Sequence, residues 1–339
     1  MKKSLKMFIL AILVVLISLV IIFCYFFIGK VKTNKNITWG VDFSQMQAEA
    51  LRLDWKKVYT ALLDDLKVKD IKLHTQWDFI DGEKNKYFFD DVDWQISQAK
   101  KRGVKIIYVV GIKTGRWPEC HIPKWAENLD EKKQQEEALT YLKEVINRYK
   151  DNDTISFWQV ENEPFFKFGE CPSWYYKNSN FLKKEIEAVR SIDNKKPIIV
   201  SDSGDLSFWL GAAKLGDVVG ITMYRQIWIN IANKIGFPVN YFFTPMTYWR
   251  RIQIIDKLFG KKVICIELQT EPWLSKPFFG SSVEEQLESM DLEQFKKNIN
   301  FASKTGIDKF YLWGAEWWYW MKTTQNRPEI WNEAKKLFK

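Results

Sequence analysis

The feature that most constrains the fold is an alternation of short apolar runs with helical patterns across residues 37–339. The runs are apolar throughout, which is typical of strands buried on both faces of a parallel sheet. Eight such repeats predict a (β/α)8 barrel. An open doubly wound sheet is the alternative, but no glycine-rich phosphate loop supports it. The predicted strands are residues 37–43, 70–77, 104–111, 154–162, 197–202, 217–224, 262–268 and 309–315.

The segments between these runs supply the helices. Their apolar residues recur at helical spacing, and Pro328 suits the first turn of the last helix. The predicted helices are residues 54–66, 92–100, 131–149, 180–192, 284–302 and 328–338.

The first 36 residues form a separate unit. Residues 7–28 carry no charge, and as a helix they would span roughly 33 Å, enough to cross a hydrocarbon core of about 30 Å. A cleavable signal peptide is the alternative, but bulky Phe and Tyr side chains stand where a peptidase needs small ones. We therefore expect a cytoplasmic segment (1–6), a transmembrane anchor (7–28), a linker (29–36) and a catalytic domain (37–339) on the extracytoplasmic side of the cell membrane.

The charge of the chain follows from the same segment. The net charge is +9, and residues 1–36 contribute six lysines and no acid, which leaves about +3 for the rest. The basic balance therefore does not indicate nucleic-acid binding. The sequence has two histidines and no Cys/His cluster with metal-ligand spacing, so no metal or cofactor is expected.

The four cysteines fall into two pairs. Cys24 and Cys265 lie inside the predicted anchor and a predicted strand, where inert buried thiols are expected. Cys120 and Cys171 follow two neighbouring predicted strands, on the same face of the barrel. A disulfide between them is permitted in an outward-facing domain, and two free thiols are equally compatible with the sequence.

Two of the predicted strands end in carboxylates. The stretch FWQVENEPFF (157–166) carries Glu163, and VICIELQTEPW (263–273) carries Glu267. Such groups are costly at the tip of an apolar strand unless they are solvated, paired or used, and this end of a barrel is where chemistry takes place. A solvated turn explains the first stretch equally well when it stands alone, but the two together predict a carboxylate pair.

Seventeen tryptophans are far more than ordinary usage, and many fall at strand ends. We expect about half of them to pack in the core. The others would present flat faces suited to sugar rings.

These residues resemble the clan A glycoside hydrolases, a group of retaining (β/α)8 enzymes that includes the cellulase, mannanase and β-galactosidase families. The resemblance is carried by WQVENEP and by the glutamate that closes strand 262–268. It implies that Glu163, preceded by Asn162, is the acid/base and that Glu267 is the nucleophile. It further implies that Tyr224 contacts the nucleophile and that Trp313 forms the sugar platform.

Two positions depart from the pattern of that group. Lys72 stands where an arginine is frequent, and Thr222 stands where the cellulase family often has a histidine. Both departures leave the substrate open.

Cleavage with retention needs one carboxylate to attack and one acid to protonate the leaving oxygen, about 5–5.5 Å apart. Proximity to Glu267 would raise the pKa of Glu163. Asn162 would bind the sugar 2-hydroxyl, and Glu161 and Glu271 are expected in ion pairs. The remaining predicted substrate-binding residues are Trp77, Arg116, Asp202 and Glu316.

The sequence thus predicts a membrane-anchored retaining glycoside hydrolase that cleaves β-linked oligo- or polysaccharides and contacts the lipid bilayer through residues 7–28. A transglycosylase that remodels surface glycan and a non-catalytic sugar-binding barrel are the alternatives. The short linker predicts that the amino-terminal face of the barrel lies toward the bilayer. The excursion 227–248 would then lie on the distal face as a sugar platform.

Overall fold

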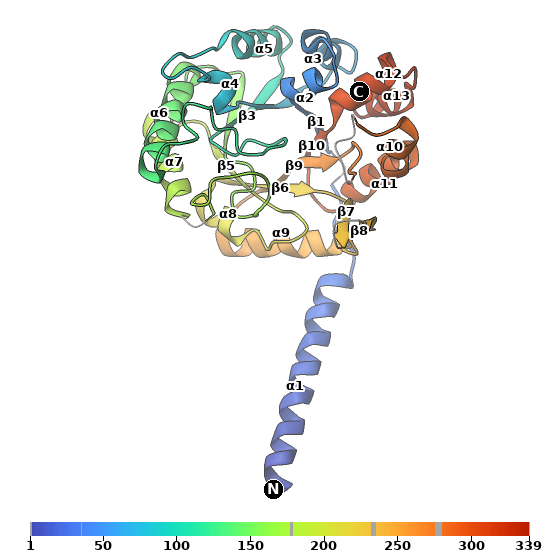
Figure 1. Ribbon diagram of the computed structural model, residues 1–339. Coiled ribbons are helices and arrows are strands. Elements are labelled where there is room, and N and C mark those ends of the chain that lie inside the picture. Colours follow the sequence, from blue (N-terminus) through green and yellow to red (C-terminus); the bar gives the residue numbers. More distant parts are fainter. Residues whose placement is uncertain (1, 35, 177–178, 232–234, 275–279, 339) are drawn as a thin grey trace.

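The computed structural model describes residues 2–34, 36–176, 179–231, 235–274 and 280–338. Eight parallel strands close into a barrel in the order β1-β10-β9-β6-β5-β4-β3-β2 (Figure 1). Each of the eight predicted strands is found in its expected place, which confirms the (β/α)8 fold. The barrel strands are β1 (Thr38–Phe43), β2 (Asp70–His74), β3 (Lys105–Val110), β4 (Ile155–Val160), β5 (Ile198–Asp202), β6 (Val218–Met223), β9 (Val263–Gln269) and β10 (Lys309–Trp313).

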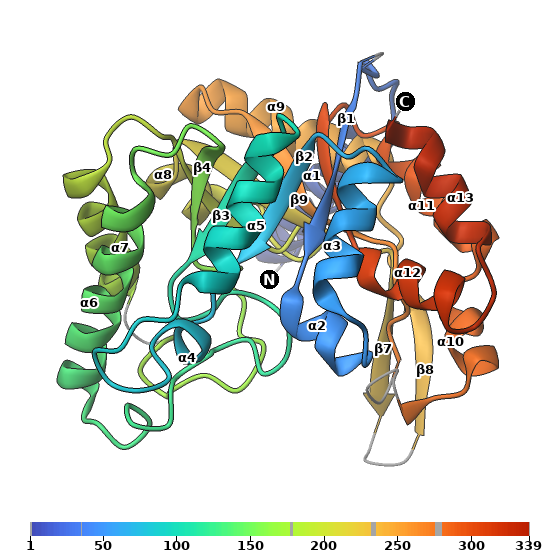
Figure 2. The same cartoon turned by 90° about the horizontal axis from the view of Figure 1, so that it is seen from above.

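Helices surround the barrel on all sides (Figures 1 and 2). Their starts follow local capping chemistry: the side chains of Asp54, Asp130 and Asp291 each accept a backbone N–H of the first turn. The helices that cover the strands are α2 (Gln45–Ala50), α3 (Trp55–Asp64), α4 (Trp77–Ile80), α5 (Asp90–Lys101), α6 (Glu131–Tyr149), α7 (Ser179–Ile192), α8 (Leu210–Leu215), α9 (Pro245–Phe259), α10 (Val283–Ser289), α11 (Leu292–Ala302), α12 (Ala315–Thr323), α13 (Glu329–Ala334) and the 3-10 turn η3 (Lys335–Phe338).

The predicted helices agree with this arrangement except in two respects. The single helix expected over 284–302 is two helices, because Asp291 caps a new start at α11. Helix α9 was not predicted, although Pro245 stands at its first turn and Gly260 ends it with a φ of 64°. The short helices α2, α4 and α8 and the helix α12 were missed as well.

Two apolar clusters hold the barrel together. Ile107, Ile199, Ile264, Ile266 and Tyr311 fill its interior. A much larger cluster lies between the strands and the helices, and its fully buried tryptophans show that many of the 17 tryptophans are packing residues, as expected. These are Trp77, Trp158, Trp209, Trp317, Trp318 and Trp331.

An antiparallel hairpin interrupts the regular alternation between β6 and α9. It consists of β7 (Gln226–Ile231) and β8 (Ile235–Asn240). Figure 2 shows it projecting beyond the end at which the barrel strands finish. Arg225 holds its base, because the guanidinium donates to the carbonyls of Tyr241 and Phe243 at 2.8 and 3.1 Å.

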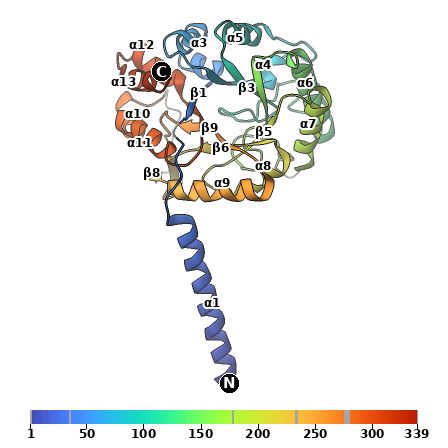
Figure 3. The same cartoon turned by 180° about the vertical axis from the view of Figure 1, so that it is seen from behind.

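Helix α1 (Lys2–Phe27) leaves the domain at the side of the barrel, under α9 (Figures 1 and 3). Its last turn packs on the domain: the Phe26 and Phe208 rings lie 5.6 Å apart. The Phe27 ring stacks on Phe242 at 6.0 Å. The Arg250 side chain also donates to the carbonyl of Tyr25 at 3.0 Å.

This attachment contradicts the predicted orientation. Figure 2 shows the strands in the plane of the page while α1 points away behind them, so α1 runs across the barrel axis and does not continue from the amino-terminal face. The linker climbs the side of the barrel to β1 (Figure 3), where Asn34 donates to the carbonyl of Gly306 at 3.4 Å. The excursion 227–248 is therefore not distal to the helix, because Phe242 contacts Phe27.

Candidate active site

Glu267 lies at the mouth of the barrel among partners that stabilise a negative charge. The Lys72 ammonium donates to its Oε1 at 2.7 Å, and the Tyr224 hydroxyl donates to Oε2 at 3.0 Å. Lys72 also pairs with Asp42 at 2.8 Å, and all three ionic side chains are almost fully buried. Burial opposes the charged form of Lys72, but the two carboxylates outweigh it and raise its pKa.

A bulge in β9 turns Glu267 toward the barrel axis. The register between β6 and β9 shifts from Ile221 opposite Cys265 to Thr222 opposite Glu267, so β9 holds one extra residue. Ile264 and Ile266 already point inward, and strict alternation would send Glu267 outward. The bulge therefore allows consecutive side chains, Ile266 and Glu267, to reach the interior.

Glu163 stands at the end of β4 on a strained turn. Its φ is 45° and that of Glu161 is 62°, both in the left-handed region that side chains other than glycine rarely adopt. The turn is held by hydrogen bonds, because the Glu163 N–H donates to Ser201 Oγ at 2.8 Å and Lys113 Nζ donates to the Glu163 carbonyl at 3.2 Å. The Thr222 hydroxyl donates to its carboxylate at 2.7 Å.

The surroundings of Glu163 favour its protonated form. Burial is the main cause and the nearby negative charge of Glu267 is the second, and together they raise the pKa of Glu163 to about 7. Glu119, in the loop after β3, is buried beside the same two carboxyl groups, and its pKa is raised to about 8. The expectation that Glu267 raises the pKa of Glu163 thus agrees with the geometry.

A buried ionic network lies at the mouth of the barrel around Arg116. Arg116 pairs with Glu271 and, at 3.2 Å, with Glu316. Its guanidinium lies 3.8 Å from the centre of the Trp313 ring, whose Nε1 donates to Glu271 at 2.7 Å. Arg116 and Glu316, predicted to bind substrate, therefore have protein partners, and one face of Trp313 is covered. Glu271 is in an ion pair, as expected.

Glu161 is held in place by hydrogen bonds from the protein. It accepts N–H bonds from Ile112 and Lys113 at 2.7 and 2.6 Å, and the Tyr175 hydroxyl at 2.6 Å. Instead of the expected cation, Glu185 on α7 is hydrogen-bonded to it, and burial and the charge of Glu161 raise the pKa of Glu185 well above its usual range. Burial raises the pKa of Glu161 as well, and the hydrogen bonds that Glu161 accepts oppose this rise.

Two glycines make room for these buried glutamates. Gly111 has a φ of 124°, and a Cβ there would collide with the Glu161 carboxylate. Gly314 has a φ of 119°, and its Cβ would collide with the side chain of Glu271. Any other residue at either position would both strain the backbone and displace a glutamate.

The loops after β3 and β4 are joined covalently. Cys120 and Cys171 form a disulfide, with their Cα atoms 5.1 Å apart. This resolves the two possibilities that the sequence left open. Glu119 immediately precedes Cys120, so the disulfide fixes the loop that carries this carboxyl beside Glu163. Cys265 is a buried free thiol, as expected, and Cys24 is a free thiol on the surface of α1, the segment predicted to lie in the membrane.

The other predicted site residues divide into two groups. Asn162 and Asp202 lie at the mouth, where Asn162 accepts from Gln159 at 3.2 Å and Asp202 accepts from Ser207 at 2.7 Å. Trp77 was predicted to bind substrate, and the structure contradicts this. Its ring is fully buried against Tyr141, because the strand β2 ends at His74 and Trp77 is the first residue of helix α4.

Three residues at the mouth were not predicted: Asp42, His74 and Glu119. Asp42 and Lys72 are register partners on β1 and β2. Opposite charges inside two adjacent buried strands must pair, so this signal was present in the sequence. His74 Nε2 contacts Asp42 at 2.5 Å. Within the described residues, no group of three His, Cys, Asp or Glu side chains could hold a metal ion.

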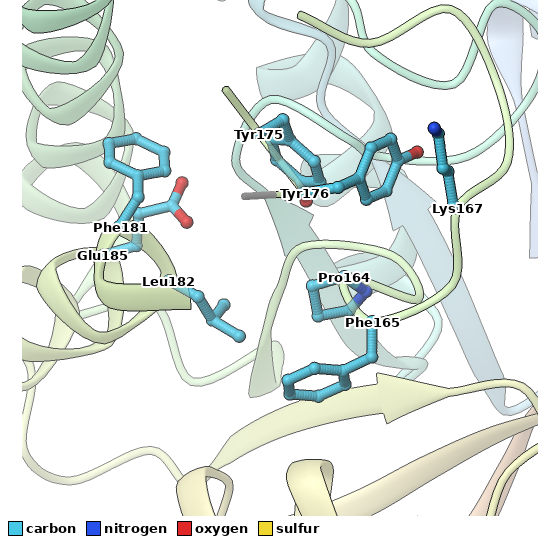
Figure 4. Close-up of a pocket in the computed structure, with 8 residues that line it drawn as sticks. All are labelled: Pro164, Phe165, Lys167, Tyr175, Tyr176, Phe181, Leu182 and Glu185. Atoms are coloured by element: carbon cyan, nitrogen blue, oxygen red, sulfur yellow. The ribbon is translucent and has the colours of Figure 1, made fainter. Parts of the chain in front are cut away.

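The cavity in Figure 4 is distinct from this site. It measures about 350 Å³ and lies between the loop after β4 and helix α7. Tyr175, Tyr176 and Phe165 line it, with Glu185 at its edge, and neither Glu163 nor Glu267 does. The two carboxyl groups at the barrel mouth therefore lie outside this cavity.

Comparison with known proteins agrees with this geometry. The sequence model described as "Cellulase (glycosyl hydrolase family 5)" matches residues 34–237, more than half of the chain. The chain belongs to this family. Glycosyl hydrolase family 5 is part of clan A, which confirms the resemblance.

A curated relative, the "Probable mannan endo-1,4-beta-mannosidase A" of Aspergillus flavus, is 24% identical over 122 residues. The match covers 33% of this chain and 30% of that protein, so it spans under a third of the relative's length.

Solved structures share the fold at low identity. An endo-β-1,4-xylanase of glycoside hydrolase family 10 from Gloeophyllum trabeum is 14% identical, with a TM-score of 0.58 over 91% of this chain and 98% of that one. An exo-β-1,4-mannosidase from Opitutaceae bacterium strain TAV5 is 12% identical, with a TM-score of 0.53 over 84% and 54%. At such identities the likeness establishes the barrel alone.

Proposed function

We propose that this domain hydrolyses β-linked glycans with retention of anomeric configuration, with Glu267 as nucleophile and Glu163 as acid/base. The observation that carries the proposal is the contrast between the two carboxyl groups. Glu267 is paired with the Lys72 ammonium, whereas Glu163 is buried with its pKa raised to about 7. A double displacement needs one ionised carboxylate as nucleophile and one protonated carboxylic acid as proton donor.

The reaction follows from these roles. A Glu267 oxygen attacks the anomeric carbon while Glu163 gives its proton to the leaving glycosidic oxygen, so that a glycosyl ester forms and an alcohol leaves. Glu163, now a carboxylate, takes a proton from water, and the resulting hydroxide displaces Glu267. Tyr224 donates to Glu267 and keeps its attacking oxygen oriented, and Asn162 would bind the 2-hydroxyl of the sugar.

The test is chemical rescue of Glu267→Ala in the full chain, held in detergent, with an activated aryl β-glycoside as substrate. Azide should restore turnover and give the inverted α-glycosyl azide, which NMR identifies. Glu316→Ala is the matched control, because Glu316 is a buried glutamate bonded to Arg116 and Ser44 and should show no rescue. A β-glycosyl azide from Glu267→Ala would mean that another residue is the nucleophile.

The substrate proposal is coarser. Membership of glycosyl hydrolase family 5 and the mannanase relative support a β-linked polysaccharide such as mannan, xylan or glucan. A screen of the full chain against soluble β-linked oligosaccharides, with product masses recorded, tests this directly. Products longer than the substrate would indicate transfer to a sugar in place of hydrolysis.

We further propose that α1 anchors the enzyme in a membrane with the barrel on the extracytoplasmic side. Residues Leu5–Phe27 have a mean hydropathy of 3.4, and none of their most apolar stretch is buried in the protein. Such a helix is roughly 34 Å long, which matches a hydrocarbon core of about 30 Å. The Cys120–Cys171 disulfide supports an oxidising compartment for the domain.

A further inference from the structure

The end of α1 does not point freely out of the domain but is packed into it. Phe26 lies edge-on to Phe208, in the loop after β5. Phe27 stacks on Phe242, between the hairpin and α9. If α1 spans a bilayer, its last turn lies at the boundary between hydrocarbon and headgroups, so Phe208 and Phe242 must lie at the same depth.

The domain surface at this depth is unusually apolar for a soluble barrel. Phe208 is 52% exposed and Phe242 is 72% exposed, although both are large aromatic residues. Leu206 and Leu210 flank Phe208 in the same segment and are 57% and 40% exposed. A cluster of exposed apolar side chains marks an interaction site, and Phe and Leu side chains are among those that interfacial segments bury at the boundary between headgroups and acyl chains.

Helix α9 extends this surface sideways. Figures 1 and 3 show it lying lengthwise across the top of α1, along the side of the barrel that faces the candidate span. Leu258, near its far end, is 63% exposed, and Lys257 beside it is exposed too. The linker adds Lys30 and Lys32 next to the end of α1. Exposed apolar side chains together with basic residues suit the surface of a bilayer that contains anionic lipids.

We propose that this face, defined by Leu206, Phe208, Leu210, Phe242 and Leu258, docks on the lipid bilayer. The barrel then lies on its side on the membrane. This proposal rests on the anchoring role proposed for α1. The candidate active site opens at the end of the barrel, so its mouth looks along the membrane surface and not away from it. The enzyme is placed to act on glycan held at the bilayer surface, within reach of the projecting hairpin.

Spin labels on the full chain in vesicles of phosphatidylcholine and phosphatidylglycerol test the proposal. Cys24→Ser removes the exposed native thiol, and single cysteines are then placed at positions 208, 242 and 258. Position 88 is the matched control, because Phe88 is 42% exposed next to α5, on the far side of the barrel from α1. A label at position 15 reports whether α1 is in the bilayer.

Power saturation compares oxygen, which concentrates in lipid, with a water-soluble nickel chelate. Labels at positions 208, 242 and 258 should favour oxygen over the chelate by several-fold relative to position 88. Equal accessibility at these three positions and at position 88, with position 15 in lipid, would overturn the docking and leave the anchor intact. A water-exposed label at position 15 would overturn the anchor, and the docking with it.

Discussion

Glu163 and Glu267 are the same residue type at the same end of one barrel, yet their environments are opposite. Glu267 receives hydrogen bonds from an ammonium and a phenol, and a second carboxylate helps to hold that ammonium. Glu163 receives one hydroxyl, is buried, and faces the charge of Glu267. The difference teaches that a side chain becomes nucleophile or acid through its neighbours, and that these neighbours come from several strands.

The largest effect should come from exchanging the two glutamates for glutamine. Glu267→Gln should lower kcat by about 10⁴-fold or more on every substrate, because the covalent step is lost. Glu163→Gln should lower it by about 10²–10⁴-fold on natural glycosides, but much less on an aryl glycoside whose leaving group needs no proton. Steady-state rates on both substrates check this. Equal losses on the two substrates for Glu163→Gln would remove the distinction between the residues.

Lys72→Met should come next. It leaves the buried carboxylates of Asp42 and Glu267 without a cation, and removing one member of a buried ion pair costs about 3–5 kcal/mol. Chemical denaturation of the full chain in detergent, followed by near-UV circular dichroism, measures the loss. Lys72→Arg is the control, because it keeps the charge and should retain most of the stability. A Lys72→Met variant as stable as the parent would mean that the carboxylates do not depend on this ammonium.

Loss of the disulfide should affect the surroundings of Glu163 and not those of Glu267. Replacing Cys120 and Cys171 by serine releases a loop closed over a sequence separation of 51 residues, and such a loss costs about 2–4 kcal/mol. Because Glu119 immediately precedes Cys120, kcat should fall on the substrates that need protonation by Glu163 before turnover of the aryl glycoside is affected. Cys265→Ser, at a buried free thiol in β9 that forms no disulfide, is the control. An equal loss on both substrate types would place the effect on the whole fold.

The smallest effect is a shift in the pH profile. The acid form of Glu163 is present below its pKa of about 7 and is lost above it, so kcat/KM should fall as the pH rises through about 7. The Thr222 hydroxyl stabilises the carboxylate and lowers that pKa. Thr222→Val should therefore move the alkaline limb upward, by at most about 1 pH unit. A downward movement would contradict the role given to this hydrogen bond, and Glu163→Gln should abolish the limb.

The strands and the carboxylate pair were predictable because each depends on a local pattern. A buried strand shows as a continuous apolar run, and Glu163 and Glu267 interrupt such runs at their ends. The partners of these residues were harder. Asp42 is a charged residue inside a buried strand, and that strand alone gives no reason for it. The reason becomes clear once Lys72 is known to lie opposite it on β2. Trp77 was assigned to the wrong element because the sequence around it does not show where β2 ends and α4 begins.

The attachment of α1 could not be predicted from local patterns at all. It depends on contacts between segments that are far apart in sequence, such as Phe26 with Phe208 and Tyr25 with Arg250. A linker length limits how far the domain can move but does not choose the face it presents. The hairpin β7–β8 was missed for a different reason: its strands pair with each other and not with the barrel, so they fall outside the strand–helix alternation.

The glycines beside the buried glutamates have an evolutionary consequence. Gly111 cannot acquire a side chain while Glu161 keeps its position, and Gly314 cannot acquire one while Glu271 keeps its position. A substitution of either glycine creates a clash, whereas a substitution of the glutamate beside a retained glycine creates none. Across relatives of this chain, the glycine should therefore be kept wherever its glutamate is kept, while the glutamate can change first.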